Sequence, residues 1–278
     1  MPLTPGKPQT VAPGVLRIVA GNAGLMTGPG TNTYLLGERE IAVLDPGPED
    51  AHHLQCILAA ADGRSIRWIL VTHTHPDHSP LAGTLARATG ARLIGLPPPA
   101  DGRQDSAFMP DEMPEDGRAL ELGGIALRTI HTPGHASNCL CYLLPHERLL
   151  FTGDHVLEGV SPVILAPDGD MSAYIESLDK LADLPFERIA PGHGHLMDDG
   201  KAAIAALRAH RLAREAKVCR CLPREPGTTI DELTAAVYDD VPLERHHWAR
   251  LTLEAHLVKL GREGKASEQA GLWRTLES

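Results

Sequence analysis

The stretch Thr72-His73-Thr74-His75-Pro76-Asp77-His78 is the most informative part of this chain. It places three imidazoles and one carboxylate in the short run from His73 to His78. Packing does not explain this density, because His and Asp are seldom buried unless they are paired or bound to something. Imidazole nitrogen and carboxylate oxygen are ligands of catalytic zinc, which keeps one position open for water. The stretch therefore predicts a catalytic metal site.

The neighbouring residues indicate where this stretch lies. Residues 66–71 form an apolar, β-branched run that predicts a buried strand directly before the first histidine. Ser79 and Pro80 are typical of a helix start, and Gly90 is typical of its end. Ser172 is the expected N-cap of a later helix. The histidines are therefore expected on a loop at the carboxyl end of a strand, where open α/β sheets place their sites.

The spacing within the stretch has a geometric meaning. His73 and His75 alternate by two, so in an extended chain both side chains point to the same side. Asp77 and His78 are adjacent and can diverge toward a second metal ion. The alternative is a solvated, histidine-rich loop.

Three later segments repeat the pattern of an apolar strand, a glycine turn and a ligand-type side chain. They are His131-Thr132-Pro133-Gly134-His135, Leu149-Leu150-Phe151-Thr152-Gly153-Asp154-His155 and Arg188-Ile189-Ala190-Pro191-Gly192-His193-Gly194-His195. Each segment alone could end in a surface residue, but four such strand ends in one chain favour a site. His155 points away from Asp154 if the segment is extended. His193 and His195 compete for the last ligand position.

The combined series resembles the metallo-β-lactamase superfamily. The residues that carry the resemblance are His73, His75, Asp77, His78, His135, Asp154 and His193. The chain has no Cys ligand of the drug-hydrolysing class B lactamases, and Asp154 stands where a bridging carboxylate is expected. In this it is similar to the glyoxalase II and ribonuclease-type branch. The nearest likeness is to lactamase-β-like proteins, a branch with single-strand endoribonucleases, polyketide thioesterases and a winged-helix-like tail.

The resemblance implies an architecture. We expect an α/β fold of the αββα sandwich type, with two facing mixed sheets, helices outside and metals at one edge. The catalytic domain would span residues 1–200. Residues 201–278 would form a small helical, winged-helix-like C-terminal domain.

The sequence of this domain predicts helices over 201–218 and about 245–260, and residues 227–233 are typical of a capped helix start. The first of these helices has an apolar side that includes Leu207 and Leu212. Its arginines are expected on other faces: Arg208, Arg211 and Arg214.

The resemblance also implies roles for the site residues. His73, His75 and His135 would hold the first metal, while Asp77, His78 and His193 would hold the second. Asp154 would bridge the two ions. A water between the metals would be the nucleophile, and Asp77 would orient it and carry a proton to the leaving group. Asp45 could buttress a ligand loop, or could only form the turn before Pro46-Gly47.

Three functions remain open at this point. The first is a dinuclear Zn²⁺ hydrolase of a small ester, thioester or lactone, with Mn²⁺ or Fe²⁺ as other possible metals. The second is an endoribonuclease that cuts single-stranded RNA. The third is a nucleic-acid-binding regulator whose metal site is not catalytic.

Composition and charge bear on these alternatives. The net charge is −10, and residues 1–200 hold 13 basic and 25 acidic side chains, against 13 and 11 in residues 201–278. The catalytic part therefore has no basic stripe of the kind that binds a polyanion. The five cysteines have no framework spacing and are expected to be reduced thiols. No run is long enough to span a membrane, and the start lacks a signal-type apolar stretch, so we expect a cytoplasmic protein.

Two further regions allow two interpretations each. The proline-rich stretch from Pro97 to about Gly117 could be an active-site lid or a passive insertion. The C-terminal tail could engage nucleic acid or acyl chains through His246, His247 and Arg250. Alternatively it packs on the core, walls the active site and contributes to a homodimer interface.

Overall fold

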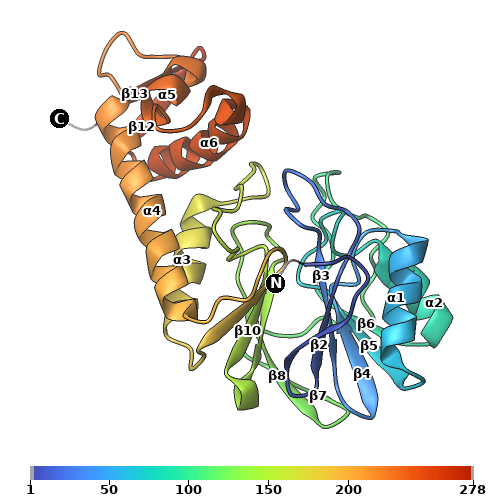
Figure 1. The fold of residues 1–278 in the computed structure, drawn as a ribbon. Coiled ribbons are helices and arrows are strands. Elements are labelled where there is room, and N and C mark those ends of the chain that lie inside the picture. The colour runs from blue at the N-terminus through green and yellow to red at the C-terminus, as the bar shows by residue number, and fades with distance from the viewer. Residues whose placement is uncertain (1–2, 277–278) are drawn as a thin grey trace.

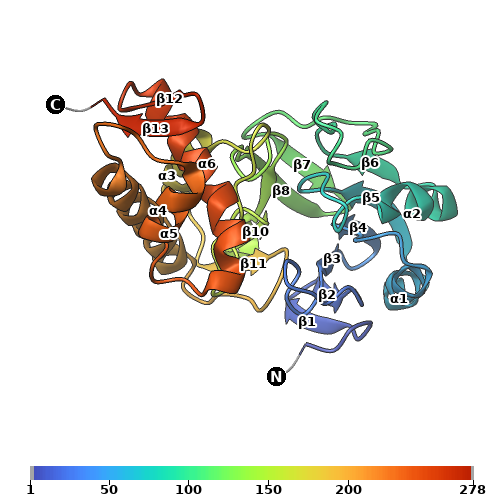
Figure 2. The same cartoon turned by 90° about the horizontal axis from the view of Figure 1, so that it is seen from above.

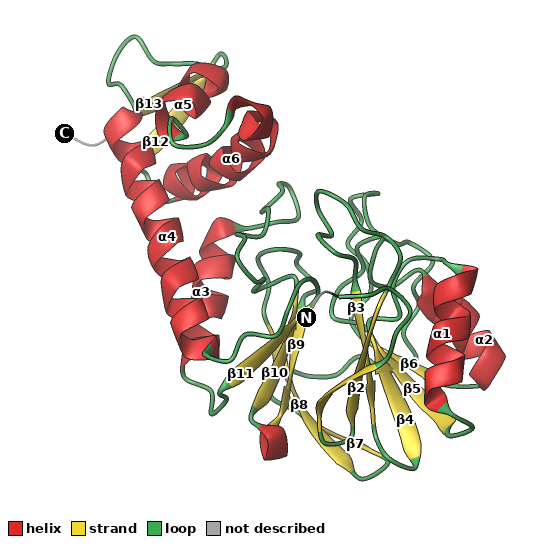
Figure 3. Cartoon of the chain, viewed as in Figure 1, coloured by secondary structure: helices red, strands yellow, loops and turns green. Residues whose placement is uncertain are grey.

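Two β-sheets lie face to face in the body of the protein, and helices cover the outer face of each sheet (Figure 1). The computed structural model describes residues 3–276. The four layers confirm the expected αββα sandwich (Figure 3). Among the described residues, none of the helices is both long and apolar enough to cross a membrane.

The first sheet keeps its six strands in chain order. The strands are β1 (Gln9–Ala12), β2 (Val15–Val19), β3 (Asn32–Leu36), β4 (Glu40–Leu44), β5 (Ser65–Leu70) and β6 (Arg92–Ile94). The first four are antiparallel, whereas β4, β5 and β6 are parallel to one another. Parallel neighbours need crossovers, and α1 (Ala51–Ala61) and α2 (Leu81–Thr89) supply them.

The second sheet has five strands, which also lie in chain order. From one edge they are β11 (Arg188–Pro191), β10 (Leu149–Gly153), β9 (Leu140–Leu144), β8 (Ile125–His131) and β7 (Ala119–Leu122). Only β10 and β11 are parallel, and α3 (Met171–Ala182) connects them. A short 3-10 helix, η1 (Pro145–Glu147), joins β9 to β10.

Aliphatic and aromatic side chains from both inner faces fill the space between the sheets. Tyr34 and Phe151 meet edge to face across it, with ring centroids 5.0 Å apart. A second core lies beneath α1 and α2, and a third lies beneath α3 on the opposite side. Both sheets are thus buried on both faces, which explains why β3, β9 and β10 are buried along their whole length.

The C-terminal part has a hydrophobic core of its own. It consists of the end of α4 (Gly200–Cys221), α5 (Ile230–Val237), η2 (Leu243–Arg245), α6 (His246–Arg262) and the hairpin β12 (Ala266–Gln269) and β13 (Leu272–Thr275). Three helices followed by a two-stranded wing confirm the winged-helix expectation. Figure 2 shows this part on the side of the body opposite α1 and α2. The boundary at residue 200 stays a prediction, because α4 packs on both α3 and α5.

Several local details differ from the sequence prediction. Asp170, not a later serine, caps α3 by accepting hydrogen bonds from two backbone N–H groups. Pro80 is the N-cap residue of α2, and the Ser79 hydroxyl instead donates to Asp105. Arg211 and Arg214 are buried along with Leu207, so they do not lie on faces away from the packed side of α4. The start of α5 is as expected, because Thr229 and Glu232 form a complete capping box.

Candidate metal centre

The site residues come from loops at one edge of the sandwich. The segments after β5, β8, β10 and β11 all end there (Figure 1). They bring seven side chains into two groups, in each of which the ligand-type atoms lie within 4.8 Å of one another. The first group is His73, His75 and His135, and the second is Asp77, His78, Asp154 and His193. Both groups are able to bind a metal ion.

The first group contains only imidazoles. His135 Nε2 lies 3.0 Å from His75 Nδ1, and the ring of His73 contacts both neighbours. Burial and the nearby imidazoles lower the pKa of His75 to about 3 and hold that of His73 well below its usual value. Burial also lowers the pKa of His135. All three rings are therefore neutral at physiological pH, as metal binding requires.

The second group combines two carboxylates with two imidazoles. His193 Nε2 lies 3.1 Å from Asp77 Oδ2 and 3.3 Å from Asp154 Oδ2, and His78 Nε2 lies 3.3 Å from Asp154 Oδ1. Burial opposes charge on His193, yet Asp154 and Asp77 raise its pKa to about 9. The same contacts outweigh burial at Asp154 and hold its pKa well below its usual value. The two carboxylates and the two imidazoles of this group thus present their ligand-type atoms to one another.

Asp154 lies between the two groups. One of its oxygens, Oδ2, is 3.3 Å from His193 Nε2 and 4.0 Å from His135 Nε2, so the carboxylate faces both. The Asp154 carboxylate can take this position only because residue 192 is glycine. A Cβ on Gly192 would stand only 2.4 Å from Asp154 Oδ1. A Cβ on Gly153 would meet the Thr72 hydroxyl at the same short distance. The glycines beside the site residues therefore make room for the cluster.

Asp45 lies directly behind the histidine-rich stretch. Its Oδ1 accepts the backbone N–H of Thr72 at 2.7 Å, and its Oδ2 accepts the Thr72 hydroxyl at 2.7 Å. The same Oδ2 lies 2.9 Å from His78 Nδ1. Asp45 adopts a left-handed backbone with φ of 50°. Of the two interpretations left open for this residue, the structure supports the buttress, since the carboxylate orients His78 so that Nε2 faces the other ligands.

The other histidines are oriented in a similar way. His73 Nδ1 contacts the Thr72 hydroxyl at 3.0 Å, His135 Nδ1 contacts the Val163 carbonyl at 2.8 Å, and His193 Nδ1 contacts the Gly30 carbonyl at 3.2 Å. A carbonyl can only accept, so Nδ1 of His135 and of His193 donates a proton to it, and Nε2 is the nitrogen that faces the other site residues. These contacts fix the rings before any ligand arrives.

The cluster fits a bound metal. Among the described residues, four of its buried polar atoms have no hydrogen-bond partner: His73 Nε2, His78 Nε2, His193 Nε2 and Asp154 Oδ1. Buried polar atoms without partners are costly, and here they converge on the same small region. The donor set of imidazole nitrogens and carboxylate oxygens suits zinc, manganese and iron.

Two histidines near the cluster lie outside both groups. His195 is exposed, and its backbone N–H donates to Glu158. His155 is fully buried, with its ring against that of Tyr174 at a centroid distance of 4.6 Å. Neither belongs to a group of potential ligands within residues 3–276. The geometry thus favours His193 over His195 and agrees with the opposite direction expected for His155.

Hydrogen bonds hold the long stretch after Pro97 against the site. Thr74 Oγ1 donates to Gln104 Oε1 at 2.6 Å, and the Asp105 N–H donates to the Thr74 carbonyl at 2.8 Å. Asn138 also reaches Thr74 Oγ1, at 2.6 Å. Sequence reasoning missed Gln104 and Asn138, because no pattern in the chain marks them as partners of Thr74. These hydrogen bonds tie the stretch to the loop that carries His73 and His75, and its role as a lid stays a prediction.

Two of the three residues proposed for nucleic-acid contact are engaged within the C-terminal part, whereas His247 is exposed. Arg250 forms an ion pair with Asp231 at 2.8 Å, and His246 Nε2 contacts the Val241 carbonyl at 3.0 Å. Other cations of this part also face carboxylates: Arg214, Lys217, Lys259, Arg262, Lys265 and Arg274. This pairing leaves little positive charge for a phosphate backbone.

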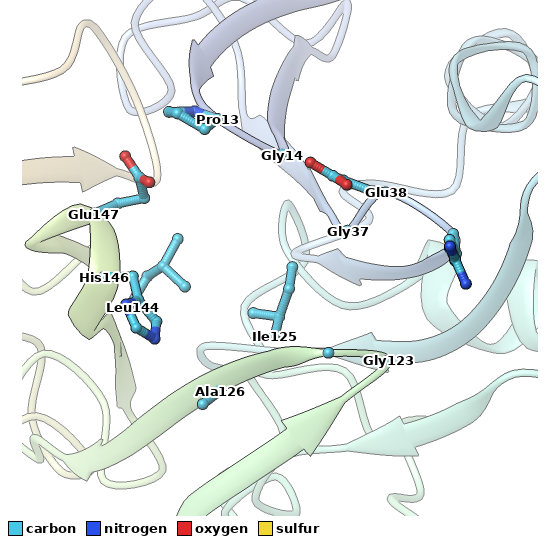
Figure 4. A pocket seen from close by; sticks show the side chains of 12 residues that line it. Pro13, Gly14, Gly37, Glu38, Gly123, Ile125, Ala126, Leu144, His146 and Glu147 are labelled. Atoms are coloured by element: carbon cyan, nitrogen blue, oxygen red, sulfur yellow. The ribbon is translucent and has the colours of Figure 1, made fainter.

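A cavity of about 460 Å³ lies at the opposite edge of the sandwich (Figure 4). Turns between strands line it, including Gly14, Gly37 and Gly123, together with Leu144 and Glu147. It is separate from the histidine cluster, because β8 begins beside the cavity and ends beside the cluster.

Comparison with known proteins matches both parts of the chain. The family described as "Metallo-beta-lactamase superfamily" matches residues 26–193, and "Beta-lactamase associated winged helix domain" matches residues 229–273. The chain is 32% identical over 270 residues to "Beta-lactamase-like protein 2 homolog" of Drosophila melanogaster, which covers 90% of this chain and 89% of that protein. It is also 32% identical over 254 residues to "Atrochrysone carboxyl ACP thioesterase" of Aspergillus chevalieri, covering 84% and 76%.

Solved structures share the whole architecture. A metallo-beta-lactamase family protein from Thermus thermophilus superposes with a TM-score of 0.79 at 24% identity, covering 96% of this chain and 100% of that one. A beta-lactamase domain protein from Burkholderia ambifaria gives a TM-score of 0.81 at 21% identity, covering 99% and 95%. At these identities the likeness shows the fold alone.

Proposed function

The chain belongs to the metallo-beta-lactamase superfamily and is a hydrolase of that superfamily, and we propose that it cleaves a small ester, thioester or lactone with two zinc ions. One observation carries this proposal. Seven ligand-type side chains from four strand ends converge in two adjacent groups, and four of their buried atoms have no hydrogen-bond partner among residues 3–276.

The proposed assignment follows the two groups. His73, His75 and His135 would hold one ion, and Asp77, His78 and His193 would hold the other. Asp154 would be shared by both ions, and its position between His135 and His193 supports this role. Zinc in such a site lowers the pKa of water toward neutrality and polarises a carbonyl oxygen.

Asp77 is the proposed catalytic residue. It is the more accessible carboxylate of its group, with a side chain 25% exposed against 11% for Asp154. Burial would raise its pKa, but His78 and His193 lower it below the usual value, so Asp77 is ionised at neutral pH. An ionised carboxylate at the open side of the cluster can orient an attacking water and carry its proton to the leaving group.

Charge supports an acyl substrate over a nucleic acid. Residues 1–200 carry 13 basic and 25 acidic side chains, and the cations of the C-terminal part are largely ion-paired. The relative named as a thioesterase acts, by its name, on a carrier-bound acyl group. A thioester is therefore the first substrate class to test.

Metal content is the first half of the test. Elemental analysis of the purified protein should find two zinc ions per chain, with one lost in His73→Ala and one lost in His78→Ala. A single iron per chain, or none of these metals after reconstitution, would contradict the dinuclear zinc assignment.

Hydrolysis is the second half. The zinc-loaded protein should cleave members of a panel of acyl thioesters, esters and lactones, and Asp77→Asn should lose this activity while it folds normally. Asp198→Asn is the matched control, because Asp198 is exposed and lies beside the site segment without joining the cluster. Absence of hydrolysis across the panel, or equal activity in Asp77→Asn, would refute the acyl-hydrolase proposal.

A further inference from the structure

Arg211 is a buried cation on α4, outside both sheets. It is only 3% exposed, although arginine is rarely buried without a specific partner. Its Nη2 donates to the backbone carbonyl of Pro162, in the loop between β10 and α3. Arg208, one turn earlier on the same helix, instead pairs with Asp179 at the surface. Arg211 thus contacts a backbone carbonyl in a buried loop, whereas Arg208 contacts only a surface carboxylate.

The carbonyl next to that contact orients a member of the first metal-binding group. Val163 follows Pro162, and its carbonyl accepts from His135 Nδ1 at 2.8 Å. The position of this carbonyl sets the direction of the His135 ring, because the hydrogen bond fixes which nitrogen faces the cluster. Arg211 therefore fixes the loop segment of Pro162 and Val163, and the Val163 carbonyl of this segment orients the His135 ring.

A second set of contacts leads from Arg211 to Asp154. The guanidinium lies over the ring of Tyr174, 5.2 Å from its centroid. The Tyr174 hydroxyl donates to the carbonyl of His155 at 2.7 Å, and His155 directly follows Asp154. The same tyrosine packs against the loop before His135, since a Cβ on Gly134 would stand 2.3 Å from the Tyr174 Cα.

We propose that Arg211 is a positioning residue for the candidate metal centre, through which α4 fixes His135 and the backbone beside Asp154. The inference rests on the proposed function. It assigns the long helix that leads into the winged-helix part a role in ligand geometry, beyond covering the sheet. Arg262 of α6 adds a second tie, because it pairs with Asp170, whose N–H donates to the Gly134 carbonyl.

The test compares Arg211→Met with Arg208→Met in the full-length chain. Both variants remove one guanidinium from α4, but only the first loses the contact with the Pro162 carbonyl. Co²⁺ binding is measured by titration against a competing chelator and followed by the visible absorption of the bound ion. Loss of a direct outer partner of a metal ligand weakens affinity by about 10–100-fold. Arg211 acts one residue away from such a partner, so we expect a loss at the lower end of this range, roughly 10-fold, for Arg211→Met and no change for Arg208→Met.

A second measurement needs no metal. Hydrogen exchange of the metal-free protein should be faster over residues 160–165 in Arg211→Met than in Arg208→Met. Unchanged exchange and unchanged Co²⁺ affinity in Arg211→Met would overturn the inference. A wild type that binds no Co²⁺ would instead remove the proposed function itself, so the two failures are distinguishable.

Arg211→Lys keeps the test decisive if the methionine variant does not fold. Lysine retains the charge and one donor but lacks the planar group that lies on Tyr174. We expect Co²⁺ affinity several-fold below that of the wild type. Wild-type affinity in this variant would overturn the inference.

Discussion

Two buried polar clusters in this protein use the same residue types in opposite ways. The first is the candidate metal centre. The second, in the C-terminal part, is Glu215 of α4 with His256 and Lys259 of α6, and we call it the helix cluster. His73 of the metal centre and His256 of the helix cluster are 1% and 0% exposed, so burial does not distinguish them.

The two clusters differ in how many of their polar atoms have hydrogen-bond partners. Both oxygens of Glu215 are engaged, one with His256 Nδ1 at 3.3 Å and the other with Lys259 Nζ at 2.6 Å. These contacts outweigh burial and lower the pKa of Glu215. His256 Nε2 has no partner in the described part of the chain, but it is a single atom. In the metal centre four such atoms converge, which indicates a binding site, whereas the helix cluster satisfies its own charges.

The largest expected effect tests the bridging position. Asp154→Ala should lose one zinc ion and lower hydrolysis by roughly 10³-fold, because metal polarisation supplies several kcal/mol and each 1.4 kcal/mol is worth tenfold. Elemental analysis and initial rates measure the two effects. Asp198→Ala serves as the exposed control. Two zinc ions per chain in Asp154→Ala would show that this carboxylate does not bridge.

The next prediction compares His193 with His195, which are separated in the sequence only by Gly194. His193→Ala should lose the second zinc ion, since its Nε2 faces both Asp77 and Asp154. His195→Ala should keep both ions and nearly full activity, because the side chain is exposed. Elemental analysis of both variants measures the metal content. Loss of zinc in His195→Ala, with none in His193→Ala, would show that His195 is the ligand instead of His193.

A smaller effect is expected behind the ligands. Asp45→Asn removes the charge that faces His78 Nδ1 while keeping a residue type that tolerates φ of 50°. Zinc affinity should fall by about 10–100-fold in chelator competition. Asp62→Asn is a matched control, because Asp62 is exposed and has φ of 51° at the end of α1. Equal losses in both variants would mean that backbone strain, not the buttress, matters.

Much of the body could be predicted from the sequence. Ligand-type side chains follow four apolar runs, and the resemblance carried by these residues led to the sandwich. The structure confirms the sandwich and brings all seven side chains into two groups. The reason is local, because each residue lies within a few positions of its strand end, and these strand ends meet at one edge.

The contacts that hold the site could not be predicted. Arg211 reaches a backbone carbonyl, Gln104 meets a threonine from a long loop, and any residue offers a carbonyl, so no sequence pattern records such pairs. Two helix caps were wrong for a related reason. Ser79 and Ser172 have suitable side chains, but Asp170 caps α3, and Asp105 takes the Ser79 hydroxyl.

The smallest effect is expected in the helix cluster. Glu215→Gln should lower the free energy of unfolding by about 1 kcal/mol at pH 7 and leave zinc content unchanged, because the cluster is structural. The lowered pKa of Glu215 means that its stabilisation is present above the unfolded-state pKa of about 4.3 and is lost as pH falls through the lower folded-state value. Urea unfolding of the metal-free protein should therefore show the gap between wild type and variant closing toward acid pH. Glu254→Gln on α6 is the control, and a loss of zinc in the Glu215 variant but not in this control would make the two clusters one functional unit.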